Sequence, residues 1–166
     1  MIELADGTRI SLVDRRALST IAVDREGSSS LPKLGREASD PTLDATYLTG
    51  VLQRRKIAIK PALMDQAVLA GLGNIYAAEA LWESQVDPRS PASKMSPDTL
   101  ARLVEAIRLV LNPRQRRPGR YTETRNRSRF AVYDREGQEC RRCGGTIQRI
   151  VQAGRSTYFC PDCQTL

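Results

Sequence analysis

The two Cys-x-x-Cys pairs near the C-terminus restrict the fold of this chain more than any other feature. They read CRRC at 140–143 and CPDC at 160–163, with sixteen residues between them. Two such pairs at this spacing are typical of a zinc ribbon, in which each pair forms a tight turn that directs both sulfur atoms toward one metal ion. The alternative is two pairs without metal, serving as redox-active or buried thiols.

The absence of histidine limits both the possible metal ligands and the possible catalytic groups. None of the 166 residues is histidine. A zinc site here must therefore use cysteine or carboxylate ligands, and Ser–His and Cys–His nucleophile pairs are excluded. Because four thiolates complete a tetrahedral coordination sphere, we predict one structural zinc ion in a finger spanning residues 130–166. Its predicted ligands are Cys140, Cys143, Cys160 and Cys163.

The chain is strongly basic, with 26 Lys and Arg against 19 Asp and Glu, a net charge of +7 and a pI of about 9.6. Such a balance indicates an anionic partner, most commonly nucleic acid, although a basic surface also serves solubility. Seven arginines and one acid lie in residues 114–129. No segment is typical of a signal peptide or approaches the roughly 18 apolar residues of a membrane helix. We expect a cytoplasmic protein with no membrane partner and with reduced cysteines.

The hydrophobic pattern predicts a mainly α-helical fold with a small β zinc ribbon. Residues 1–25 alternate as strands, with a hairpin turn at Asp6-Gly7, and are too few for a complete sheet domain. Residues 26–41 are rich in Ser, Gly and Pro and are typical of a linker. Within residues 42–129, the clearest helix follows Ser96-Pro97 and ends at Asn112-Pro113. Its predicted buried stripe is Leu100, Leu103, Val104, Ile107 and Leu111.

The segment GLGN at 71–74 predicts the junction of two helices. We expect one helix to begin at Pro61 and to end at Gly71, a left-handed C-cap, and the next to begin with Asn74 at or near its N-cap. The unpaired N–H groups at such a helix start bind anions, phosphate above all, and Lys60 is close enough in sequence to reach the same anion. The alternative is an ordinary helical hairpin with glycine caps.

These motifs occur together in an order that resembles a known family. IKPALMDQAVLAGLGNIYAAEALW at 59–82 and FAVYDREGQECRRCGGTIQRIVQAGRSTYFCPDCQ at 130–164 closely resemble the C-terminal half of formamidopyrimidine-DNA glycosylase and its endonuclease VIII relatives. The resemblance covers residues 42–166. It implies a helix–two-turn–helix DNA-binding domain over 42–129, with the arginine-rich stretch as its tail, followed by a β-hairpin zinc finger. Both parts would grip DNA on either side of a lesion.

The resemblance also implies three DNA-contacting residues. Asn74 matches the phosphate-binding asparagine of the family's GNIYA motif, and Lys60 matches the lysine of its KPxLMD stretch, which lies near the DNA. Arg155 matches the finger arginine of the RxTxxC pattern, which contacts phosphate around the lesion. Without the resemblance, Arg155 is equally well explained as an ordinary turn residue.

The catalytic groups of the family have no clear counterpart in this sequence. The family uses an N-terminal proline amine as its nucleophile and an adjacent glutamate, whereas Ile2 stands in place of the proline and Glu3 matches by position alone. Residues 1–25 resemble only the end of the family's N-terminal β-sandwich. Leu18 stands where an aromatic wedge is usual, and residues 114–129 replace the lesion-capping loop. We therefore expect no catalytic residue here.

The resulting expectation is a DNA-binding, catalytically inactive member of this family. Its partner would be double-stranded DNA, damaged or undamaged, and the protein would be a monomer with one zinc ion. One alternative is a residual DNA glycosylase or abasic-site lyase in base excision repair, because an accessible amine promotes β-elimination weakly. Another is a protein- or RNA-binding adaptor built on the zinc ribbon, although base-stacking aromatic residues are scarce.

Overall fold

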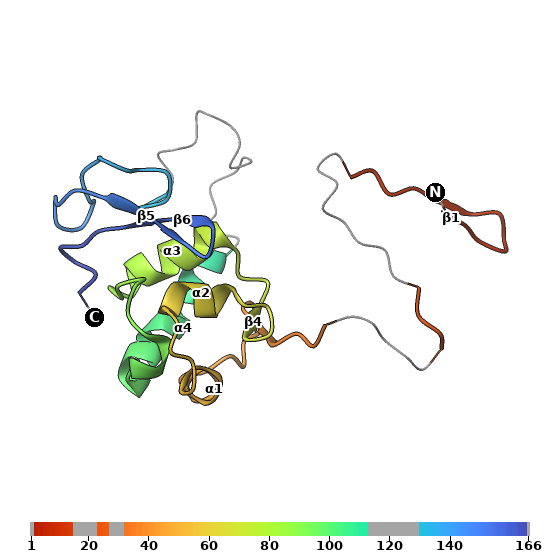
Figure 1. Cartoon of the computed structure of the whole chain (residues 1–166), viewed down its shortest axis with the longest axis horizontal. Coiled ribbons are helices and arrows are strands. Elements are labelled where there is room, and N and C mark those ends of the chain that lie inside the picture. The colour runs from red at the N-terminus through yellow and green to blue at the C-terminus, as the bar shows by residue number, and fades with distance from the viewer. Residues whose placement is uncertain (1, 15–22, 27–31, 113–129, 166) are drawn as a thin grey trace. The chain divides into compact units, whose positions relative to one another are not determined.

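The computed structural model of the chain describes residues 2–14, 23–26, 32–112 and 130–165 (Figure 1). Two features of the sequence lie outside these residues: the arginine-rich segment 114–129 and Leu18, which stands at the expected wedge position. The chain forms two compact units, Met1–Pro32 and Lys33–Leu166. None of the helices in the described residues has the length and apolar composition needed to cross a bilayer.

The first unit contains the hairpin that the sequence predicts. Strand β1 (Ile2–Glu3) pairs antiparallel with β2 (Arg9–Ile10) around a turn in which Gly7 has a φ of +82°. The Thr8 N–H donates to Asp6 Oδ1 at 2.9 Å and fixes the turn. Glu3 and Arg9 lie opposite each other and form an exposed ion pair at 3.1 Å.

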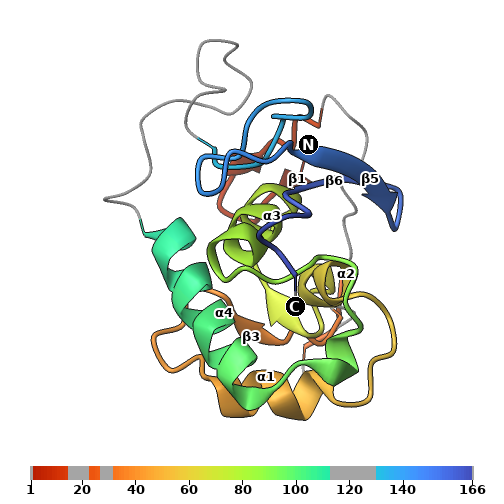
Figure 2. The same cartoon turned by 90° about the vertical axis from the view of Figure 1, so that its left-hand side faces the viewer.

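The second unit is built on four α-helices and two small sheets in its described residues. The helices are α1 (Ala45–Leu52), α2 (Ile59–Met64), α3 (Asn74–Glu83) and α4 (Pro97–Leu111). Helix α4 packs against both α3 and α1, and α2 packs against α3 (Figure 2). The core between them is aliphatic, with fully buried leucines contributed by every helix. Each such leucine stabilises the fold by about 1.5–3 kcal/mol relative to an exposed one.

Helix α4 matches its prediction closely. Ser96 is the N-cap, and its Oγ accepts a hydrogen bond of 3.1 Å from the Thr99 N–H, while Pro97 occupies the first turn. The predicted stripe faces the core, except that Leu111 at the end of the helix is only partly buried. Local signals therefore define this helix completely.

The segment predicted as a linker, 26–41, is partly folded into the second unit. Strand β3 (Arg36–Glu37) pairs in parallel with β4 (Leu69–Ala70), and Ala38 is buried. Gly35 is needed for this contact, because a Cβ at that position would lie 2.4 Å from the Val68 carbonyl oxygen. A two-residue strand whose partner lies more than thirty residues away leaves no signal in local composition, which explains the difference.

The helix predicted from Pro61 to Gly71 begins earlier in the sequence than expected and is also shorter. Helix α2 begins at Ile59, so Pro61 is its third residue, and it ends at Met64. Asp65 and the residues after it form a turn that leads into β4, because Asp65 Oδ1 accepts a hydrogen bond from the Ala67 N–H at 2.9 Å. Gly71 does adopt the left-handed conformation, with a φ of +79°, but it follows a strand rather than a helix.

The C-terminal finger consists of a hairpin and the loops that carry the cysteines. Strands β5 (Gln148–Gln152) and β6 (Arg155–Phe159) pair antiparallel, with Gln152 opposite Arg155. Ala153 and Gly154 form the turn, and both have positive φ. Strand β6 packs against α3, so the finger rests on the helical domain (Figure 1).

Candidate metal centre and nucleic-acid interface

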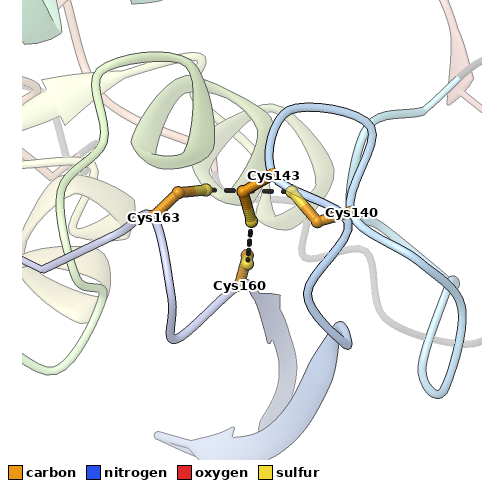
Figure 3. A group of neighbouring side chains, drawn as sticks. All are labelled: Cys140, Cys143, Cys160 and Cys163. Carbon is orange, nitrogen blue, oxygen red and sulfur yellow. Dashed lines mark hydrogen bonds between the residues drawn. The ribbon is translucent and has the colours of Figure 1, made fainter.

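The four cysteines meet at one point, as the spacing of the two pairs predicts (Figure 3). Their sulfur atoms all lie within 4.8 Å of one another. The Sγ atoms of Cys140 and Cys163 are 3.8 Å apart, and those of Cys143 and Cys160 are 3.4 Å apart. Tetrahedral zinc with Zn–S bonds of about 2.3 Å requires sulfur atoms about 3.8 Å apart. The separations therefore approximate those of a four-thiolate zinc site.

Each cysteine pair lies on a turn held by hydrogen bonds from backbone N–H groups. In the first turn the Gly144 N–H donates to the Cys140 carbonyl at 2.9 Å, and Gly144 has a φ of +77°. Gly145 allows the second turn to approach, because a Cβ there would meet Asp162 Oδ2 at 1.9 Å. In the second turn the Cys160 N–H donates to Gln164 Oε1 at 2.8 Å. These contacts place the four sulfur atoms around a common point.

Helix α3 contacts the metal centre directly through Trp82. Its Nε1–H donates to Cys140 Sγ at 3.3 Å. Burial opposes ionisation of Cys140, but the bonds from Trp82 and from the N–H groups of Arg142 and Cys143 lower its pKa to about 6. The Arg142 guanidinium stacks 3.9 Å from the centre of the Trp82 ring and donates to the Trp82 carbonyl at 2.6 Å. A thiolate is the form that zinc requires.

Glu79 joins the finger to α3, a role that the sequence analysis missed. Its buried carboxylate accepts hydrogen bonds from the N–H groups of Ala131, Val132 and Tyr133 at 2.7, 3.0 and 2.9 Å. Burial raises the pKa of Glu79, and these three donors oppose the change. The only available signal was an acid inside the apolar helical stretch IYAAEALW. Such a residue must find donors elsewhere in the chain.

Lys60 and Asn74 form a hydrogen-bonded chain that reaches the finger. Lys60 is fully buried, and its Nζ donates to Asn74 Oδ1 at 2.6 Å. The Asn74 Nδ2 in turn donates to the Ser156 carbonyl of β6 at 3.1 Å. Asn74 is the first residue of α3 rather than its cap, and the N-cap Gly73 offers no side chain. The amide thus links α2, α3 and the finger instead of capping its own helix.

Arg155 brings a second positive charge to the same place. It is exposed at the start of β6, next to the Ser156 that Asn74 contacts. Burial and then the charge of Arg155 lower the pKa of Lys60 to about 8. Among the described residues neither cation forms an ion pair with a carboxylate. The three residues predicted to contact DNA therefore converge from three elements, and their contact with DNA stays a prediction.

Comparison with known proteins identifies both parts of the second unit. Residues 34–123 match the family described as "Formamidopyrimidine-DNA glycosylase H2TH domain", and residues 137–166 match "Zinc finger found in FPG and IleRS". The match to this finger, together with the four clustered cysteines, establishes a structural zinc ion as the metal of the site.

The chain is also similar to curated proteins and solved structures. It is 40% identical over 175 residues to formamidopyrimidine-DNA glycosylase of Roseiflexus sp. (strain RS-1), covering 99% of this chain and 64% of that protein. It is 38% identical over 174 residues to that of Chloroflexus aurantiacus, covering 98% of this chain and 63% of that protein. The chain thus spans less than two thirds of the length of these relatives.

Two solved structures extend the similarity to the fold. The Lactococcus lactis enzyme bound non-covalently to DNA containing an AP site superposes with a TM-score of 0.71 at 31% identity, covering 81% of this chain and 51% of that one. MutM in complex with DNA containing carbocyclic 8-oxo-G gives a TM-score of 0.70 at 33% identity, covering 81% and 52%. With its helix–two-turn–helix domain and its finger both matched, this chain belongs to the formamidopyrimidine-DNA glycosylase family.

Proposed function

We propose that this chain binds double-stranded DNA by holding a backbone phosphate between Lys60, Arg155 and the first turn of α3. The observation that carries the proposal is the hydrogen-bonded chain from Lys60 through Asn74 to the Ser156 carbonyl, with Arg155 beside it. In this arrangement two cations lie close to a helix N-terminus that has no side-chain cap. The function is independent of base sequence, because phosphate contacts position a protein without reading bases.

The energetics of Lys60 favour an anionic ligand at this point. A fully buried ammonium group that has only an amide oxygen as its partner is desolvated without charge compensation, which costs several kcal/mol by general estimates. A phosphate would supply the missing negative charge and would favour the protonated form of Lys60. The relatives described above were solved with DNA that contains an AP site or carbocyclic 8-oxo-G, which agrees with a DNA ligand.

The decisive experiment measures binding of a fluorescent duplex by anisotropy over a range of salt concentrations. Lys60→Met keeps most of the side-chain volume without the charge, and Arg155→Gln removes the second charge. Each should weaken binding and reduce the dependence of log K on log salt by about 0.9, the slope for one phosphate contact. Arg102→Gln, an exposed cation on α4, is the matched control. Retention of wild-type slopes by both site variants would rule the site out.

Competition with duplex RNA completes this experiment. DNA should displace the labelled duplex at lower concentration than RNA of equal length. The reverse order would favour the alternative of an RNA-binding adaptor.

We further propose that the residues of this chain bind DNA without excising bases. In support, the chain aligns with less than two thirds of the length of the relatives, and residues 1–25 resemble only the end of the family's N-terminal β-sandwich rather than the part that carries the proline nucleophile. Borohydride trapping on abasic DNA tests this directly. No covalent protein–DNA adduct should form at protein concentrations that saturate binding.

A residual lyase is the second candidate, favoured by the position of Lys60 next to Asn74 at the proposed phosphate site and by burial, which lowers the pKa of its amine; the fully buried amine would have to become exposed to reach an abasic sugar. At a pKa of about 8, part of the Lys60 amine is neutral near physiological pH. A neutral amine attacks the aldehyde of an abasic sugar, loses water and forms an imine that borohydride reduces. An adduct that forms with the wild type but not with Lys60→Arg would establish this activity. An adduct that survives this substitution would exclude Lys60 as the nucleophile.

A further inference from the structure

A group of exposed cations lies beside the proposed phosphate site and is not used by it. We propose that these residues, Arg54, Lys56 and Lys94, form a second row of phosphate contacts that extends the DNA footprint beyond Lys60, Asn74 and Arg155. We call these three cations the basic edge. The inference rests on the proposed DNA-binding function and identifies a further part of the same interface.

Two short segments are hydrogen-bonded together to form the basic edge. The Ala92 N–H donates to the Ile57 carbonyl at 2.9 Å, and the Ser93 N–H donates to the Arg55 carbonyl at 3.0 Å. Ala58 and Pro91 form an antiparallel bridge next to the contact between Ala92 and Ile57. Arg54 and Lys56 from the segment before α2 are therefore held next to Lys94, which ends the short 3₁₀ helix η1 (Ala92–Lys94).

The three side chains are available for a partner, whereas their neighbour Arg55 is not. Arg55 donates to Asp65 at 2.7 Å in a partly buried ion pair, so its charge is used within the fold. Arg54, Lys56 and Lys94 are exposed, and among the described residues their side chains have no hydrogen bond or ion pair. Three uncompensated positive charges on adjoining segments attract a polyanion.

The basic edge is connected to the proposed phosphate site through residues 88–90. The Gln152 Nε2 of the finger hairpin donates to the Pro88 carbonyl at 3.0 Å, and the Ile59 N–H donates to the Ser90 carbonyl at 2.8 Å. One stretch of backbone thus contacts the finger, α2 and the basic edge in turn. Figure 2 shows α2 between the β5–β6 hairpin and the segments that precede α2 and follow α3.

The reach of the chain sets the size of the additional footprint. Arg54 precedes Lys60 by six residues, and six residues span at most about 20 Å when fully extended. At a rise of about 3.4 Å per base pair, this distance corresponds to about six base pairs. Arg54 and Lys56 should therefore engage phosphates within about six base pairs of the one held by Lys60, and Lys94, held next to them, should engage a phosphate nearby.

The experiment measures the binding of duplexes of about 16 and 24 base pairs by the full chain, zinc bound. Replacing Arg54, Lys56 and Lys94 together by glutamine should lower the salt slope by about 2.7 on both duplexes, three contacts at about 0.9 each. Between 50 and 200 mM salt, the wild type should then lose about 40-fold more affinity than the triple variant.

A control with the same change in net charge separates specific contacts from general electrostatics. Arg25, Lys33 and Arg102 are exposed cations elsewhere in the chain, and their joint replacement by glutamine also removes three charges. This control should retain the wild-type slope on every duplex. Two results would overturn the proposal. One is an equal effect of the two triple variants, and the other is unchanged binding of the duplexes by the variant in which Arg54, Lys56 and Lys94 are replaced. Failure of the wild type to bind any duplex would instead refute the proposed function.

Discussion

The side chains of Lys60 and Asn74, which lie fourteen residues apart in the sequence, share a hydrogen bond of 2.6 Å at the junction of α2, α3 and the finger. Asn74 can occupy this position because its amide offers an acceptor to the lysine and a donor to the Ser156 carbonyl. Neither a purely donating nor a purely accepting side chain would satisfy both neighbours.

Replacing Asn74 separates its structural role from its proposed DNA contact. Asn74→Ala leaves Lys60 buried without a partner, and we expect the free energy of unfolding to fall by about 1–3 kcal/mol. Asn74→Asp keeps the bond from Lys60 but places a negative charge where phosphate would bind, so it should weaken DNA binding more than alanine does. Urea unfolding and anisotropy measure the two effects. Weaker binding by alanine than by aspartate would contradict the proposed position of the phosphate.

The buried lysine predicts an unusual dependence of stability on pH. The pKa of Lys60 is about 8 in the folded chain against an ordinary value of 10.5. Between these values the unfolded chain holds more protons than the folded chain, so the free energy of unfolding rises with pH. The destabilising effect of charged Lys60 is thus complete below pH 8 and is relieved above it. Denaturant unfolding at pH 7 and 9.5 should show the wild type gaining stability relative to Lys60→Met.

The same residue predicts that DNA binding weakens at alkaline pH. Phosphate favours the charged form of Lys60, so above pH 8 the complex must take up a proton, and affinity falls by up to about tenfold per pH unit. Lys60→Arg carries a charge that does not titrate in this range and provides the comparison. A pH profile of binding that is the same in both proteins would show that Lys60 does not contact the DNA.

Loss of the Glu79 carboxylate should release the finger from α3. Glutamine offers one acceptor oxygen where three N–H groups converge, so Glu79→Gln should cost at least about 2 kcal/mol. Amide exchange at Ala131, Val132 and Tyr133 should accelerate while zinc remains bound. Glu83→Gln is the control, because the ion pair of Glu83 with Arg142 is long, at 3.8 Å, and partly exposed. That change should cost less than about 1 kcal/mol.

Zinc removal should be visible in the fluorescence of the single tryptophan. Trp82 donates to Cys140 and stacks under Arg142, so unfolding of the finger exposes its ring to water. A strong chelator should shift the emission to longer wavelength and abolish the contribution of Arg155 to DNA binding. The helical circular dichroism should persist, because the core of α1, α3 and α4 does not include the metal site. Unchanged emission after complete zinc loss would contradict the predicted coupling.

The sequence alone was sufficient to predict the elements that depend on only a few neighbouring residues. The cysteine spacing predicted a cluster that the structure confirms, because the coordination geometry of zinc fixes what two short turns must present. Ser96-Pro97 and the apolar period likewise defined α4. Lys60, Asn74 and Arg155 were selected mainly through family resemblance, since a glycine-flanked helix start and one turn arginine have ordinary explanations.

Only the tertiary structure decided the features that join distant segments. Glu79 binds Val132 across 53 residues and Asn74 binds Ser156 across 82, and no local pattern encodes either partner. The parallel pairing of β3 with β4 drew part of an apparent linker into the fold, and the Asp65 turn ended α2 before Gly71. Buried polar groups must find partners wherever the packed chain brings them, so their partners are set by packing rather than by neighbouring residues.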